Sequence, residues 1–251
     1  MITDIYTMLW KESKSLLRYQ GRRSQLLVSM LTPLIVALIF PIQFGIDWAE
    51  GYFSLFVGLV IPLLVVGITV PDAFAGERER HTLETLLASR LSDGIILIGK
   101  MMVCVIAGWL VTIMVFLLSL VVLNLAHGKA GIILYKPEVL AAQILLSLGM
   151  SWLVAALGVL FSMNAPTVQI AQQNLFTSIM VPMMLLGFIP MIVLLLPALS
   201  EKLNFIKGII SNLNFDQLVG IVIGVLLILD GFLLWINLTR FKRTRVMSQL
   251  N

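Results

Sequence analysis

Long apolar stretches separated by short polar segments dominate the pattern of this chain. Six of these stretches are long enough for a helix that crosses the hydrocarbon core of a bilayer, which takes about 20 residues. Their side chains do not alternate between apolar and polar, as the strands of a membrane barrel would, so the pattern predicts helices. The predicted spans cover about 24–46, 51–73, 98–126, 138–162, 168–197 and 217–239.

The fourth and fifth spans come from one uncharged stretch, which runs from Val139 to Ser200. This stretch is too long for a single membrane helix. A polar turn with a proline, from Ser162 to Pro166, divides it in two.

The segment before the first span, residues 1–22, has a different pattern. Ile5, Leu9 and Leu16 share one face of a helical wheel, and the basic side chains cluster opposite them. This pattern predicts an amphipathic helix that lies in the membrane interface. The alternative is a cationic tail that only fixes the orientation of the first span.

Composition supports a membrane protein. The 251 residues are 59% hydrophobic and only 12% charged, about half the charge of an ordinary soluble domain. The expected fold class is therefore an all-α integral membrane protein, with one transmembrane domain over residues 1–251. The single cysteine, Cys104, excludes an internal disulfide and a CxxC metal pair.

The basic residues predict the orientation, because short cytoplasmic loops collect Lys and Arg. With six spans and both termini in the cytoplasm, 13 of the 17 basic residues fall on the cytoplasmic side. The other four are Lys129, Lys136, Lys202 and Lys207. We therefore expect a multi-pass protein of the cytoplasmic (plasma) membrane. The basic residues form clusters and no continuous stripe, so nucleic acid is not an expected partner.

The predicted loop between spans two and three, about 76–95, is the most informative segment. A charged run, Glu77 to Arg80, is followed by Thr82, which can cap a short helix with Glu84 in its first turn. On that helix Leu83, Leu86 and Leu87 share one face. The pattern alone leaves two interpretations open. The Leu face either docks a partner protein or rests on the bilayer, with the charged run as a solvated helix end.

A family resemblance bears on this choice. The string from Gly76 to Lys100, GERERHTLETLLASRLSDGIILIGK, resembles the signature of the ABC-type-2 (ABC-2) permease family, approximately G-E-R-E-x-G-T-L-E-x-L-L-A-[ST]-P followed after a spacer by G-K. His81 stands where the family usually has Gly, and Arg90 where it often has Pro. The positions that match are Glu77, Arg78, Glu79, Thr82, Leu83, Glu84, Leu86, Leu87, Ala88, Gly99 and Lys100.

The resemblance implies the transmembrane permease subunit of an ABC exporter. In that family a separate ATPase subunit binds ATP and Mg²⁺, and the permease docks it through this cytoplasmic loop, the coupling helix. The complex would hold two ATPase copies and a second permease chain, identical or related, in the lipid bilayer. The substrate stays open. The residues implied in ATPase coupling are Glu77, Arg78, Glu79, Arg80, His81, Thr82, Leu83, Glu84, Leu86 and Leu87.

We expect no catalytic residue, metal ligand or cofactor in this chain. Gly99-Lys100 lacks the upstream glycine and the following hydroxyl of a phosphate-binding loop. The two histidines, His81 and His127, are predicted on opposite sides of the membrane, and no nucleophile and base share a polar pocket. The chain is therefore not expected to be an enzyme by itself.

Polar residues within the spans are candidate functional groups. Asp230 lies about midway along span six, where an ionised carboxylate costs roughly 2.5 to 3.5 kcal/mol. Gln172 and Gln173 lie near the start of span five. Each either contacts a transported ion or substrate or bonds to a neighbouring helix, and the second role is also expected for Gln143 in span four.

Three other functions remain open from the sequence. One is a haem-export or copper-site maturation permease. Another is an ion-coupled secondary transporter that needs no ATPase, in which Asp230 would be essential. The third is a membrane scaffold that recruits an ATPase without moving a substrate.

Overall fold

The computed structural model describes residues 7, 9–14, 23–51, 53–80, 82, 92–128, 131–195 and 214–241. Within these ranges all regular structure is helical. The helices are α2 (Arg23–Phe44), α3 (Ile46–Glu50), α4 (Phe53–Pro71), the π-helical turn η2 (Asp72–Gly76), α5 (Glu77–Glu79), α7 (Asp93–His127), α8 (Pro137–Asn164), α9 (Val168–Leu195) and α11 (Phe215–Arg240).

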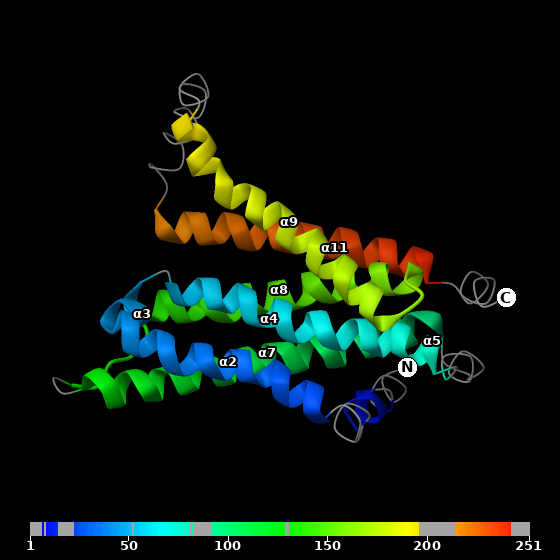
Figure 1. Cartoon of the computed structure of the whole chain (residues 1–251), viewed down its shortest axis with the longest axis horizontal. Coiled ribbons are helices and arrows are strands. Elements are labelled where there is room, and N and C mark those ends of the chain that lie inside the picture. The colour runs from blue at the N-terminus through cyan, green and yellow to red at the C-terminus, as the bar shows by residue number, and fades with distance from the viewer. Residues whose placement is uncertain are drawn as a thin grey trace.

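Helix α8 is at the centre of the bundle. It contacts α4, α7, α9 and α11, while α2 packs against α7 and α4 (Figure 1). The long helices run along the same axis, except that α9 crosses the bundle at an angle. This arrangement gives α8 a buried face toward α4 and leaves α11 largely exposed on the outside.

Small residues let the central helices approach closely. A Cβ atom at Gly158 of α8 would lie 2.8 Å from Val70 of α4, and one at Gly108 of α7 would collide with Val66 of α4. Membrane helices lack a hydrophobic driving force between them, so close packing of this kind supplies much of their association. Gln143 adds a buried polar contact, because its Nε2 donates to Ser54 Oγ at 2.6 Å. The expected helix-to-helix role of Gln143 is confirmed.

The end of the bundle that carries α3 is closed by aromatic and amide side chains. Trp48 Nε1 donates to the Tyr135 hydroxyl at 3.1 Å, and that hydroxyl donates to the Phe116 carbonyl. Burial raises the pKa of Tyr135 to about 12, although the hydrogen bond from Trp48 opposes this shift. Asn124 exchanges two hydrogen bonds with the backbone of Ile133. These bonds fix the connection between α7 and α8 against the bundle.

The helix bounds differ from the predicted spans at one end of the bundle. Span two was expected to end near residue 73, but the helix continues through η2 and α5 to Glu79. Span three was expected to begin near residue 98, but α7 already begins at Asp93. The charged motif is therefore built partly from helix, and the connection between these two helices is shorter than predicted.

Four helices in the described part of the chain are long and apolar enough to cross a membrane, namely Phe53–Glu79, Asp93–His127, Pro137–Asn164 and Asp216–Arg240. Helices α2 and α9 occupy the positions of predicted spans one and five. The all-helical membrane fold is thus confirmed, and the count of six spans stays a prediction. Residues 9–14 are helical, but most of the predicted interfacial helix over 1–22 lies outside the described residues.

Candidate functional site

The charged residues of the motif gather at the end of the bundle where α5 meets the start of α7 and the turn between α8 and α9 (Figure 1). We call the interacting side chains at this end the charge cluster. It consists of Glu12, Asp72, Glu77, Arg78, Glu79, Arg80 and Lys100.

A π-helical turn brings the motif into place. Pro71 has no N–H and cannot donate the usual hydrogen bond to the carbonyl four residues earlier. The five residues from Asp72 to Gly76 continue the helix with wider π geometry, and α5 follows directly. Single π turns within α-helices are frequent at functional sites. Here the turn lets the helix that contains α4 extend to Glu79 despite the proline.

Lys100 is the centre of the charge cluster. Its side chain is 0% exposed, and its Nζ lies 2.7 Å from Glu77 Oε1 and 3.4 Å from Glu12 Oε1. The same Nζ donates to the Ala73 carbonyl at 3.0 Å. One buried ammonium therefore joins α7 to η2 and α5, and to the helical turns at residues 9–14. Such a group is tolerated because two carboxylates and a carbonyl replace its hydration.

Arg78 and Glu79 bind two helix ends of opposite polarity. The Arg78 guanidinium donates to the carbonyls of Ser162 and Met163, at the C-terminus of α8. Glu79 Oε1 accepts a hydrogen bond of 2.7 Å from the N–H of Val168, the first residue of α9. Each charge complements the dipole of the helix end that it contacts. Neighbouring residues of α5 thereby hold the turn between α8 and α9.

Asp72 and Arg80 form an ion pair that packs against Gly76. Arg80 Nη2 lies 2.9 Å from Asp72 Oδ1, and the pair spans the π turn. A Cβ atom at Gly76 would lie 2.8 Å from Asp72 Oδ1 and 3.3 Å from Arg80 Nη2. Only glycine therefore leaves this ion pair undisturbed.

The structure places some of the residues implied in coupling and leaves others outside its described part. Glu77, Arg78, Glu79 and Arg80 each have a partner within the bundle. Both the N–H and the hydroxyl of Thr82 donate to the Glu77 carbonyl, which closes the end of α5. The others, His81, Leu83, Glu84, Leu86 and Leu87, lie outside the described residues.

Sequence reasoning missed three members of the cluster. The sequence pattern places Glu12 in an interfacial segment and Asp72 at the end of a span, and it indicates Lys100 only as a match to the family motif. The sequence does contain a signal for the pair of Glu77 and Lys100, because these opposite charges lie near the two ends of the motif, each next to an apolar span. Opposite charges placed at two membrane-helix ends predict an ion pair between them.

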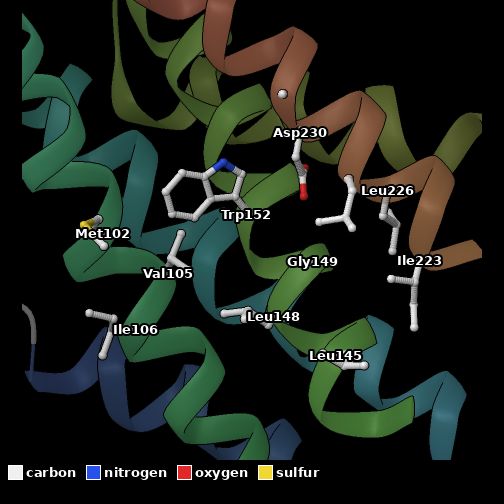
Figure 2. A pocket seen from close by; sticks show the side chains of 12 residues that line it. Met102, Val105, Ile106, Leu145, Leu148, Gly149, Trp152, Ile223, Leu226 and Asp230 are labelled. Atoms are coloured by element: carbon white, nitrogen blue, oxygen red, sulfur yellow. The ribbon is translucent and has the colours of Figure 1, made fainter. Parts of the chain in front are cut away.

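A second candidate region is a cavity of about 540 Å³ between α7, α8 and α11. Figure 2 shows the Asp230 carboxyl group pointing from α11 into this space, with Trp152 on one side and Leu226 on the other. Asp230 is 6% exposed, and its Oδ1 has no hydrogen-bond partner among the described residues. Of the described residues that line the cavity, Asp230 alone is charged.

The two candidate glutamines differ in environment. Gln172 is partly buried, and its Nε2 donates to the Ile68 carbonyl of α4 at 3.3 Å. Gln173 is exposed. Gln172 therefore bonds to a neighbouring helix, and neither residue lines the cavity that contains Asp230. Within the described ranges no three His, Cys, Asp or Glu side chains are grouped as a metal site.

The fold and the cluster define a multi-pass helical membrane protein with charged groups concentrated at one bundle end. A comparison with protein families finds that the model of the family described as "ABC-2 type transporter" matches residues 3–201. The chain belongs to this family, and is thus a permease component of an ABC-type transporter. Comparison with curated proteins gives no match.

Proposed function

We propose that this chain is the transmembrane subunit of an ATP-driven exporter. A separate ATPase subunit binds ATP with Mg²⁺, and its hydrolysis drives a substrate out of the cytoplasm through the permease. Family membership supports the partnership with an ABC ATPase. The main structural support for coupling is the charge cluster, because it ties both flanks of the proposed docking segment to the helices of the bundle.

The proposed docking segment, residues 81–91, is anchored at both of its flanks. On one side α5 is held by Arg78, Glu79 and Arg80, and on the other Lys100 holds the first turns of α7. A force on this segment would move α4 and α7, which are continuous with its flanks. The contacts of α5 with the ends of α8 and α9 would pass the movement to two further helices.

The proposed assembly contains two permease chains and two ATPase subunits in the plasma membrane, with both permease termini in the cytoplasm. Native mass spectrometry of the tagged chain, solubilised from its own membranes, tests this composition. We expect a complex with two permease chains and two copies of a protein that hydrolyses ATP. A transport-competent single chain would contradict the assembly.

Export is tested in inverted membrane vesicles, where the cytoplasmic face is outside. We expect ATP to drive accumulation of a solute that vesicles lacking the chain do not accumulate, and vanadate to stop it. Mass spectrometry of the vesicle contents identifies the solute. Accumulation driven by an ion gradient without ATP would instead indicate a secondary transporter.

A further inference from the structure

We propose that the cavity between α7, α8 and α11 binds a lipophilic cation, with Asp230 as its counterion. This inference rests on the proposed transport function, because it names the class of substrate that the permease takes from the membrane. The observations behind it are the size and lining of the cavity, its opening on the flank of the bundle, and the one charged group among the described residues that line it.

The size and lining of the cavity suit an apolar body. Its volume of about 540 Å³ falls within the range of about 300–1,000 Å³ that is usual for small-molecule sites. Leu145, Leu148, Ile223 and Leu226 give it aliphatic walls, and Trp152 adds an aromatic face. An indole is the side chain best able to attract a cation through its ring.

The cavity opens on the flank of the bundle. Four of its large apolar lining residues remain accessible from outside, with Ile106 43%, Leu145 51%, Leu148 39% and Leu227 63% exposed. That flank lies in the apolar region of helices that cross the membrane. A ligand would therefore reach the cavity from the lipid phase, which selects molecules that dissolve in the bilayer.

The charge of Asp230 selects the sign of the ligand. A carboxylate at this depth is costly unless a partner compensates it. Oδ1 of Asp230 lacks a partner among the described residues, and the side chain points into the cavity (Figure 2). A protonated amine on an apolar body would supply both the opposite charge and a hydrogen-bond donor. A single carboxylate balances one positive charge, so the ligand is a monovalent cation.

Binding of radiolabelled imipramine to the purified chain in lipid nanodiscs tests the proposal. Imipramine is a tricyclic amine that carries one positive charge at pH 7. We expect saturable binding above that of empty nanodiscs. Unlabelled iminodibenzyl, which has the same three rings but lacks the basic alkylamine chain and is uncharged at pH 7, should compete at least tenfold more weakly than unlabelled imipramine.

Matched variants locate the site. Asp230→Asn should weaken imipramine binding at least tenfold, whereas Asp216→Asn, at the exposed start of the same helix, should not change it. Leu148→Trp, which fills the cavity and keeps the carboxylate, should also weaken binding. Protection of Cys104, which is 1% exposed, from a thiol reagent reports that each variant is folded.

The proposal would be overturned if Asp230→Asn and Leu148→Trp bound imipramine as tightly as the Asp216→Asn control. The absence of saturable binding to the unchanged chain would also overturn it. Equal competition by iminodibenzyl would show an apolar site without charge selection and would also contradict it. The assay needs neither ATP nor an ATPase subunit. A negative result would therefore leave the proposed ATPase docking intact, and loss of docking would leave this binding intact.

Discussion

At the scale of single residues, Lys100 shows how a charge is kept in an apolar bundle. Its ammonium group has two carboxylates and a carbonyl around it and no exposure to solvent. The pair of Lys136 and Glu50 at the opposite end is different, because both side chains are about half exposed. Burial therefore makes the first ion pair sensitive to the loss of one partner, whereas solvent screens the second.

We predict that Lys100→Met lowers the stability of the chain strongly. Removing one partner of a buried ion pair leaves the other charge uncompensated, which costs on the order of 3 kcal/mol. Thermal unfolding in detergent measures this loss, with reaction of buried Cys104 as the readout. The double variant Lys100→Met, Glu77→Gln should recover part of the stability.

Lys136→Met is the matched control, and its effect should be at most about 1 kcal/mol because the pair with Glu50 is exposed. If both lysine variants unfold at the same temperature, the buried pair does not contribute as described.

At the scale of elements, the helix from Phe53 to Glu79 shows what the sequence reveals and what it hides. Hydropathy located the apolar part of this helix and of α7, because a membrane span has an unmistakable length and composition. Near the motif the helices extend beyond the predicted spans, which the pattern did not indicate because proline and consecutive charges are also typical of loops. In the structure a π turn accommodates Pro71, and each charge of α5 has a partner.

The partners themselves were beyond sequence reasoning. Arg78 and Glu79 contact residues that are 84 to 89 positions away along the chain, and all three of these contacts are to backbone groups. A backbone carbonyl or N–H at a helix end carries no residue type that a pattern can single out. Asp230 was found as an intramembrane charge, but the cavity beside it depends on the packing of three helices.

The π turn predicts that a Gly to Ala substitution, which usually stabilises a helix, lowers stability at Gly76. Replacing an interior helical Gly by Ala normally stabilises a protein by about 0.5–1 kcal/mol. Gly76→Ala should instead lower the unfolding temperature, because the new methyl group would displace the Asp72 carboxylate from Arg80. Gly94→Ala in α7 is the control, since its methyl group would meet only an ordinary contact with Leu238 at 3.8 Å. Stabilisation by both substitutions would contradict this role of Gly76.

At the scale of the whole molecule, the two ends of the bundle have different chemistry. One end holds the charge cluster, and the other is closed by the contacts of Trp48, Tyr135 and Asn124. This asymmetry agrees with the uneven distribution of basic residues, which predicts the charge cluster on the cytoplasmic side. A docking segment must leave the bundle on that side to meet an ATPase.

Orientation is tested by single cysteines introduced in a Cys104→Ser background. We predict that a membrane-impermeant thiol reagent labels Glu50→Cys and Lys136→Cys from outside the cell, because Glu50 is the exposed last residue of α3 and pairs with the exposed Lys136. Ser92→Cys and Arg240→Cys, exposed at the other end, should react only after the membrane is opened. The reverse labelling pattern would invert the proposed topology.

We propose that the segment between α5 and α7 docks the ATPase. Leu86 and Leu87 share one face of the predicted coupling helix, and a charge on a face buried against a partner costs far more than the loss of a contact at its rim. Leu86→Asp should therefore weaken ATPase docking strongly, and Glu79→Ala should weaken coupling more mildly than Leu86→Asp does. Asp230→Asn should leave docking unchanged, because Asp230 lies within the membrane helices.

The most direct measurement is the amount of ATPase subunit that co-purifies with tagged Leu86→Asp, relative to the unchanged chain and to Asp230→Asn. We predict at least a tenfold loss for Leu86→Asp and none for Asp230→Asn, with Cys104 protected in both. Full ATPase binding by a folded Leu86→Asp chain would show that this segment is not the docking element.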